Sequence, residues 1–366
     1  MRLVATKTIH EGTELAKAIY SDTGRVLIQK DMKLTNKMIQ RLQQLGITYV
    51  YIKDALTDDI IIKPPIPDEL RLEAVQIVKN SFADLQTNGY QKHAYIFSRV
   101  SEKMSKIVSH IIDEIKNQEE VLSILSDVII SDDYIFSHSI NVTVYALALA
   151  TELGLPQQKL EHIGLGSMLH DVGKVSIPEG ILQKKERLTD YEYEIIKTHT
   201  VEGFNMLRKS GTIPLLVAHC AYQHHERLDG SGYPRGIVGQ DIHFYGKLLA
   251  VADVFDAVTS NRVYRDALLP HEGLEILYSG SGRLFDQDLV HAFRKTIAVY
   301  PNGITVGLSD GRSGIVVKQN KHLLERPVVR IVKEFGEEII PYDVDLSNLL
   351  NVTITSCHST LENSLK

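Results

Sequence analysis

The feature that most constrains the fold is a set of histidines and aspartates placed in otherwise apolar helical sequence. Its members are His138, His170, Asp171, His199, His224, His225 and Asp253. The sequence just before them is apolar, for example in residues 165–169 and 248–252. Burying so many ionisable groups is costly unless something compensates for their lost hydration. We therefore expect the fold to gather them around metal ions.

Five imidazoles and two carboxylates form a ligand set typical of two transition-metal ions. Imidazole suits iron, manganese and zinc, and a carboxylate can bridge two ions. Two metals close together are a known device for hydrolysing phosphate esters. A lone helical histidine is more commonly a surface or hydrogen-bonded core residue. Here, however, both adjacent pairs and the other members fall on, or at the ends of, predicted helices of one unit.

Composition narrows the class of protein. A chain of 366 residues with 43% hydrophobic and 23% charged residues is expected to form two or three ordinary globular units. A net charge of −6 without an extended basic run argues against binding DNA or RNA polymers. The two cysteines, Cys220 and Cys357, imply no disulfide framework, and we find no signal peptide or membrane span. We expect a cytoplasmic protein.

Four segments can be distinguished along the chain. Residues 1–62 predict a small α/β unit, with strands near 25–29 and 47–52 around a helix that Thr35 caps and Gly46 ends. A proline-rich stretch opens the linker and connecting helices of residues 63–119, which could be a helix pair or a dimerisation arm. The remaining segments are residues 120–300 and 301–366.

Residues 120–300 are almost wholly helical in pattern. Thr189 and Glu192 form a capping box. The predicted helices cover about 132–153, 157–172, 189–209, 214–225 and 244–259, with two more in 270–299. The tail favours strands at 304–308, 314–318 and 328–332, with a hairpin turn at Asp310-Gly311. We predict a mainly α protein: a helical bundle with a small α/β N-terminal domain and a small antiparallel β appendage that packs on the bundle.

Three motifs carry a family resemblance. The runs HDVGKVSIPEGIL (170–182), HHERLDGSGYP (224–234) and ADVFDAVTSNRVYR (252–265), with His199 between the first two, resemble the HD-GYP subgroup of HD-domain metal phosphohydrolases. A His-Asp pair alone is a weak motif, but the three runs in this order are specific. The resemblance covers roughly residues 120–300. It implies an HD-type bundle around two or three metals, commonly iron, that hydrolyses cyclic di-GMP to pGpG and in some members to GMP.

The resemblance also implies roles for single residues. His138, His170 and Asp253 would hold one metal, His199, His224 and His225 the second, and Asp171 would bridge them. A hydroxide activated by both metals would be the nucleophile. The resemblance thus makes His170, Asp171 and Lys174 the expected catalytic residues. Lys174 is among them because it matches the family lysine that contacts the scissile phosphate. Its alternative role is a solvated helix cap.

Three further residues are expected substrate contacts. Arg262 and Arg265 match positions where the family places basic side chains against phosphates and guanines, for which arginine is well suited. Surface ion pairs are their alternative. Tyr233, in the GYP loop, could stack on a guanine, hydrogen-bond a phosphate, or simply order the loop by packing.

One position departs from the family pattern and affects the metal count. Trinuclear members carry a glutamate four residues before the first histidine, where this chain has Tyr134. A phenol is a poor ligand at neutral pH, because its pKa is near 10. The adjacent Asp133 would point to a different helix face. We therefore expect two divalent metals, with iron favoured by resemblance and manganese or zinc compatible with the same ligands.

Three functions fit these observations. The first is an active cyclic di-GMP phosphodiesterase, the second a receptor that binds a cyclic dinucleotide without hydrolysing it, and the third an HD phosphohydrolase of another cyclic dinucleotide. The N-terminal unit has no catalytic motif, so regulation, self-association into a homodimer and a spacer role stay open. We assign the β appendage no chemistry and expect its His322 and His358 at the surface.

Overall fold

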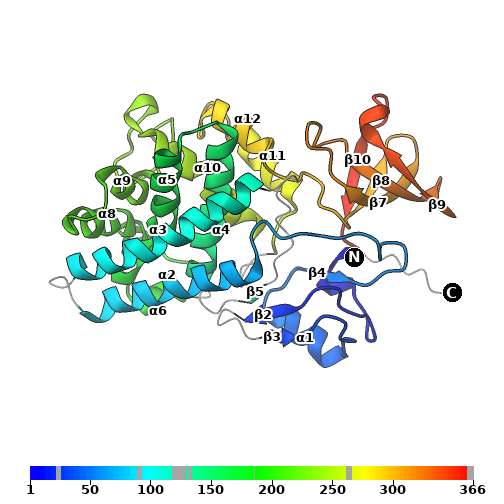
Figure 1. The fold of residues 1–366 in the computed structure, drawn as a ribbon, viewed down its shortest axis with the longest axis horizontal. Coiled ribbons are helices and arrows are strands. Elements are labelled where there is room, and N and C mark those ends of the chain that lie inside the picture. The colour runs from blue at the N-terminus through cyan, green and yellow to red at the C-terminus, as the bar shows by residue number, and fades with distance from the viewer. Residues whose placement is uncertain are drawn as a thin grey trace.

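The computed structural model describes residues 1–21, 26–88, 93–117, 129–130, 134–184, 186–260 and 266–360. Figure 1 shows a large helical bundle beside a small N-terminal α/β unit and a C-terminal β-sheet. The predicted fold class, mainly α with two small flanking units, is confirmed. Within the described ranges, no helix combines enough length with enough apolar character to span a bilayer.

The N-terminal unit contains short strands around one helix. Strand β1 (Arg2–Ala5) pairs antiparallel with β4 (Tyr49–Ile52), and β2 (Ile19–Ser21) pairs with β3 (Val26–Ile28) and β5 (Ile129–Ile130). Helix α1 (Asn36–Gln44) begins as predicted, because the Thr35 side chain accepts a hydrogen bond from the Met38 backbone N–H. Gly46, at φ 74°, follows the helix end. The buried side chains of this N-terminal unit include Leu15, Leu42 and Val50.

The connecting segment forms an antiparallel helix pair that packs on the bundle. Helices α2 (Asp68–Asn88) and α3 (His93–Asn117) lie side by side across the bundle (Figure 1). Val78, Met104 and Ile111 are wholly buried in the same core as the helices that follow. This core therefore extends across residue 120, the boundary predicted for the catalytic domain, and that boundary stays a prediction.

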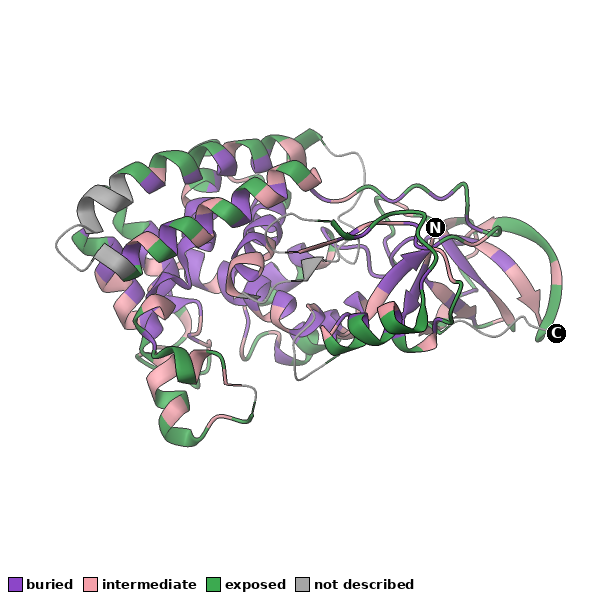
Figure 2. Cartoon of the chain, turned by 90° about the horizontal axis from the view of Figure 1, so that it is seen from below, coloured by how far each residue is buried: buried purple, intermediate pink, exposed green. Residues whose placement is uncertain are grey.

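The bundle contains most of the remaining helices. They are α4 (Tyr134–Glu152), α5 (Gln157–Leu169), α6 (Glu179–Leu182), α7 (Asp190–Lys197), α8 (His199–Lys209), α9 (Leu215–Gln223), α10 (Phe244–Thr259), α11 (Pro270–Gly280) and α12 (Gln287–Arg294). Figure 2 shows the buried residues gathered where these helices face one another. The apolar run before Asp253 lies in α10, which is buried along most of its length. Charged side chains at the centre of the bundle therefore need partners that compensate for their lost hydration.

One predicted helix is broken into two, and another ends earlier than expected. The predicted helix 189–209 begins with the expected capping box but breaks at Thr198, whose hydroxyl donates to the Ile195 carbonyl. The predicted helix 157–172 ends at Leu169, and a 3-10 turn (Val172–Ser176) follows. A side chain at Gly173 would collide with the His199 carbonyl oxygen, so glycine permits this turn to pack against α8.

The C-terminal sheet is antiparallel, as predicted, and has the strand order β10-β6-β7-β8-β9. Its strands are β6 (Thr305–Leu308), β7 (Arg312–Lys318), β8 (Val328–Glu334), β9 (Glu337–Asp345) and β10 (Ile354–His358). The sequence analysis missed β9 and β10. Strand β9 is largely exposed on both faces, so it lacks the alternation that marks a half-buried strand.

Leu324 of the β appendage lies in the core of the helical bundle, in agreement with the predicted packing. The sheet also packs on the N-terminal unit, a contact that the sequence did not predict. Its buried core includes Leu3 and Tyr51 of the N-terminal unit. The Leu3 N–H donates to the Gly303 carbonyl over 3.0 Å, and the Arg330 guanidinium pairs with Asp59 over 2.6 Å. The sheet thus covers apolar residues of strands β1 and β4 and of the segment after β4. Short apolar runs in the sequence do not show which surface will cover them.

Candidate metal centre

Helices and turns of the bundle bring all seven predicted ligands to one place. His138 lies on α4, His170 and Asp171 follow α5, and His199 begins α8. His224 and His225 follow α9, and Asp253 lies on α10. Six of the seven side chains are buried, and His225 is 20% exposed. The break between α7 and α8 places His199 at the first position of its helix, facing the other ligands.

The first cluster combines His138, His170 and Asp171, whose potential ligand atoms lie within 4.8 Å of one another. Asp253 adjoins it, because its Oδ1 is 3.1 Å from His138 Nε2. Burial lowers the pKa of His138, but hydrogen bonds with Asp253 and Asp256 raise it overall to about 9. A cation at Nε2 would therefore displace a proton from this imidazole.

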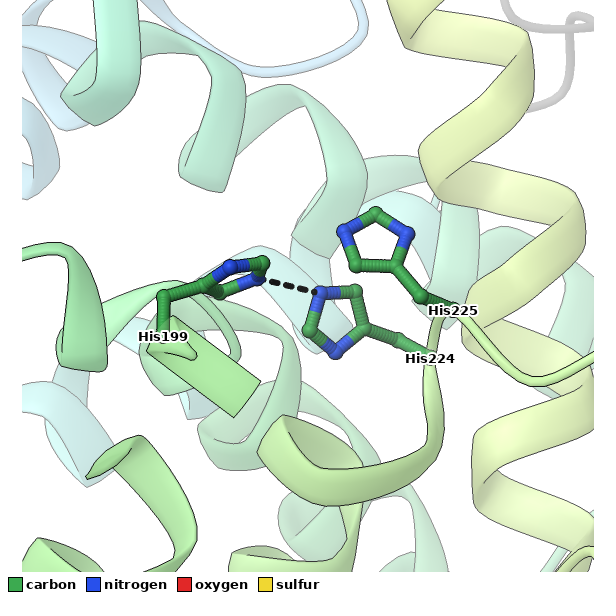
Figure 3. A group of neighbouring side chains, drawn as sticks. All are labelled: His199, His224 and His225. Carbon is green, nitrogen blue, oxygen red and sulfur yellow. Dashed lines mark hydrogen bonds between the residues drawn. The ribbon is translucent and has the colours of Figure 1, made fainter. Parts of the chain in front are cut away.

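The second cluster consists of His199, His224 and His225, whose rings point toward one another in Figure 3. The Nε2 atoms of His199 and His224 are 3.3 Å apart. Burial lowers the pKa of His199 to about 4, and burial also holds the pKa values of His224 and His225 well below the usual range. All three imidazoles are therefore neutral at pH 7, which is the form that binds metals.

Asp171 lies between the two clusters and turns one carboxylate oxygen toward each. Its Oδ2 is 3.4 Å from His170 Nε2 and 3.7 Å from His138 Nε2. Its Oδ1 is 3.4 Å from His199 Nε2 and 3.9 Å from His224 Nε2. A carboxylate in this position can bridge two cations.

Hydrogen bonds to the backbone orient three of the histidines. The Nδ1 atoms of His170, His199 and His224 lie 2.6, 2.7 and 3.0 Å from the carbonyl oxygens of Ser167, Ile196 and Cys220. A carbonyl oxygen only accepts, so each Nδ1 carries the proton and each Nε2 presents a lone pair to the site.

The donor set fits divalent transition metals. Among the described residues, neither His170 Nε2 nor Asp171 Oδ1 has a hydrogen-bond partner, although both atoms are buried. The facing lone pairs of His199 and His224 repel each other unless a cation lies between them. Imidazole and carboxylate together suit iron, manganese and zinc.

Lys174 contacts the carboxylate between the clusters. Its Nζ is 2.5 Å from Asp171 Oδ2. Burial alone would raise the pKa of Asp171, but Lys174 and the surrounding histidines lower it well below its usual range. The alternative of a solvated helix cap does not describe this position, because Lys174 points into the site and its side chain is 19% exposed.

The GYP loop folds back onto the second cluster. The centres of the Tyr233 and His225 rings are 4.6 Å apart. The backbone N–H of Tyr233 donates to the His225 carbonyl over 3.2 Å. The loop approaches so closely that a side chain at Gly232 would strike the His225 carbonyl oxygen. Buried Glu226 accepts from the backbone N–H groups of Arg235 and Ile237. Tyr233 thus packs in the loop and borders the site, so its predicted roles in substrate binding and in loop packing stay open.

Four residues discussed from the sequence lie wholly or partly outside this description. Arg262, Arg265 and Asp133 lie outside the described residues, as does the side chain of Tyr134. Their predicted roles stay predictions. In the β appendage, His322 and His358 are exposed, as expected.

Sequence reasoning missed three polar residues that support the site. Asp256 binds His138 Nδ1 over 2.6 Å, Asn141 donates to Asp256 over 2.9 Å, and Glu226 orders the GYP loop. A signal existed for two of them, because Asp256 and Asn141 lie one helical turn beyond Asp253 and His138 and so share their helix faces. Glu226 directly follows the two adjacent histidines.

Comparison with known proteins agrees with this geometry. The HD domain family matches residues 109–289. A cyclic di-GMP phosphodiesterase of Pseudomonas aeruginosa is 37% identical over 55% of this chain and 48% of its own length. A cyclic di-GMP phosphodiesterase of Thermotoga maritima is 34% identical over 66% of each chain. A 3'3'-cGAMP-specific phosphodiesterase of Vibrio cholerae is 39% identical over 42% of this chain and 30% of its own length. The chain thus spans less than two thirds of the length of the Pseudomonas and Vibrio relatives and about two thirds of the Thermotoga relative. An HD domain implies divalent metal binding, which agrees with the donor set.

Proposed function

Because the chain belongs to the HD-GYP family of HD-domain proteins, we propose that it is a metal-dependent phosphodiesterase that hydrolyses cyclic di-GMP. The observation that carries this proposal is the position of Asp171, which turns one oxygen toward each of two histidine clusters. Such a carboxylate suits a pair of cations, and a pair of cations suits phosphate-ester hydrolysis.

Two ions are proposed, each with its own ligands. His138, His170 and Asp253 would hold one, His199, His224 and His225 would hold the other, and Asp171 would contact both. When bound, the ions supply Lewis-acid stabilisation of phosphate charge and acidify water. Iron is the metal that the family favours, and manganese or zinc would satisfy the same donors.

The chain's own residues bind and orient the substrate. The Lys174 ammonium lies beside Asp171, so it can contact a phosphate oxygen placed between the clusters. Tyr233 borders the second cluster and can meet a base or a phosphate there. Arg262 and Arg265 are proposed to contact the phosphates and guanines. The surrounding apolar helices exclude bulk water, which strengthens these charge interactions.

Two alternatives concern the substrate and the turnover. A relative named for 3'3'-cGAMP favours this mixed cyclic dinucleotide as the second candidate substrate. A receptor that binds without hydrolysis is the other alternative. We propose pGpG as the first product. Identification of the nucleotides formed from cyclic di-GMP reveals whether hydrolysis continues to GMP.

The flanking units are proposed to regulate the enzyme or to assemble it. We propose the division into residues 1–62, 63–119, 120–300 and 301–366, with self-association through the N-terminal unit or the connecting helices. The Tyr49 hydroxyl donates to the Ala267 carbonyl over 3.0 Å, so the N-terminal unit touches the segment that follows Arg265. This contact offers a route by which the unit could influence substrate binding.

The test is an assay on anaerobically purified protein with its metal content measured. Wild-type protein with about two metals per chain should convert cyclic di-GMP to pGpG, and His170→Ala should abolish this activity. His322→Ala is the matched control, because His322 is exposed in the appendage, and it should retain full activity. Cleavage of 3'3'-cGAMP alone would favour the second substrate. Metal-loaded protein that binds cyclic di-GMP tightly without cleaving it would favour the receptor.

A further inference from the structure

His138 is oriented by a side chain, whereas three other histidines of the site are oriented by backbone carbonyls. Its Nδ1 lies 2.6 Å from Asp256 Oδ2, on a different helix. A carboxylate only accepts, so this contact places a proton on Nδ1 and leaves Nε2 to face the site. Because Asp256 is wholly buried on α10, the orientation of His138 on α4 depends on how these two helices pack.

Asp256 is itself held by two further donors. Its Oδ1 accepts from Asn141 Nδ2 over 2.9 Å and from the Ser260 hydroxyl over 2.7 Å. With one oxygen serving Asn141 and Ser260, the other is directed at His138. The carboxylate is therefore held in place before any cation binds.

The network continues to the connecting helix α2. The Asn141 Oδ1 accepts from the Arg71 guanidinium over 2.6 Å. Arginine only donates and a carboxylate only accepts, so the amide orientation of Asn141 is unambiguous. Arg71 is 5% exposed, and a buried guanidinium requires such a hydrogen-bond partner.

We propose that Asp256 is a positioning residue for the first metal ion, and that Asn141 and Arg71 tie its position to the connecting helix. Partners that hold a metal-ligating histidine through its second nitrogen fix the ring and raise its basicity. The inference rests on the proposed metal centre but is independent of the nucleotide that the enzyme cleaves.

The test measures metal affinity by titration of chelated protein with Mn²⁺ and Zn²⁺. Asp256→Asn retains the shape of the side chain, but its amide cannot accept from both His138 and Asn141. We expect the affinity for one of the two ions to fall about 10–100-fold, with less change for the other. Asp345→Asn is the matched control, because Asp345 accepts from Asn320 and Ser347 in the C-terminal sheet, and it should leave both affinities within about twofold.

The double variant D256N/N141D provides a rescue. Exchanging the two groups lets the new carboxylate at position 141 accept from Arg71 and from the new amide at position 256. The amide oxygen is then free to accept from His138 again. We expect the double variant to bind metal at least about fivefold more tightly than D256N, as a coupled pair should. Nitrogen-15 shifts of His138 in the zinc-loaded proteins should report a protonated Nδ1 in the wild type and in the double variant, and altered shifts in D256N.

Thermal unfolding of the chelated proteins separates metal binding from folding. If D256N binds both ions as tightly as the wild type, or if the double variant binds no better than a folded D256N, the inference is overturned while the proposed function stands. If the wild-type protein binds no metal, the proposed function fails first, and the positioning role fails with it.

Discussion

The two histidine clusters differ in what orients their ligands. In the second cluster, the Nδ1 atoms of His199 and His224 donate to carbonyl oxygens three and four residues earlier in the chain, so local backbone geometry suffices. In the first cluster, His138 depends on Asp256, which is more than a hundred residues away. The Nδ1 of His170 also donates to a nearby carbonyl, so only the His138 side of the first cluster depends on helix packing. The two clusters should therefore respond differently to change.

The largest effect is expected where the two clusters meet. Asp171→Asn retains the size of the side chain but removes the charge that both clusters face. We expect the turnover of cyclic di-GMP to fall roughly 10³-fold, which corresponds to about 4 kcal/mol of activation free energy. Steady-state kinetics and metal analysis test this. An active variant with two tightly bound metals would show that Asp171 is not shared between them.

Removal of the metals should affect the second cluster more than the first. Without a cation, the facing lone pairs of His199 and His224 repel each other, whereas His138 keeps its bonds to Asp253 and Asp256. At a metal concentration of 100 to 1,000 times Kd, binding stabilises the fold by about 3–4 kcal/mol.

Hydrogen exchange of chelated and loaded protein tests this difference. We expect a greater loss of amide protection at the start of α8 and at the end of α9, next to His199 and His224, than in α4. Equal loss in both regions would contradict the comparison.

A smaller effect is expected from the far end of the first cluster's support. Arg71→Met removes the donor to Asn141 but retains a long apolar side chain. We expect a loss of about 1–3 kcal/mol in the free energy of unfolding, because a hydrogen bond to a charged group is lost. Urea denaturation measures it.

The same variant should weaken the first ion's binding a few-fold, and less than Asp256→Asn does. The control is Arg312→Met, which breaks an arginine contact with Asp310 in the C-terminal sheet. If Arg71→Met weakens metal binding no more than Arg312→Met, α2 is not coupled to the centre.

The smallest effect concerns the helix that leads to the second cluster. Hydrogen bonds with Lys184 and with the Thr189 backbone lower the pKa of Glu192 from 4.5 to about 2. The stability that Glu192 contributes should therefore be fully present above pH 4.5 and lost as the pH falls through about 2. Glu192→Gln should lower the melting temperature slightly at pH 7 and less at pH 2. An equal decrease at both pH values would mean that the charge of Glu192 does not stabilise α7.

The sequence alone determined the features that depend on neighbours along the chain. The apolar run ending in Asp253 predicted helix α10 with its observed bounds, and Thr189 with Glu192 predicted the start of α7. The motifs also named seven ligands that the fold places together, although their metal-binding roles remain predictions. These signals are local, because capping, helical periodicity and adjacent histidines act over a few residues.

Only the tertiary structure decided which distant residues support those ligands. Helical spacing places Asp256 and Asn141 on the same helix faces as two ligands, but nothing along the chain links them to each other or to Arg71, because these contacts exist only when α2, α4 and α10 pack together. The sheet's contact with the N-terminal unit, through Leu3 and Gly303, arises in the same way. A buried polar side chain must be paired, but the partner is chosen by the helix or strand that lies opposite, and this depends on the whole fold.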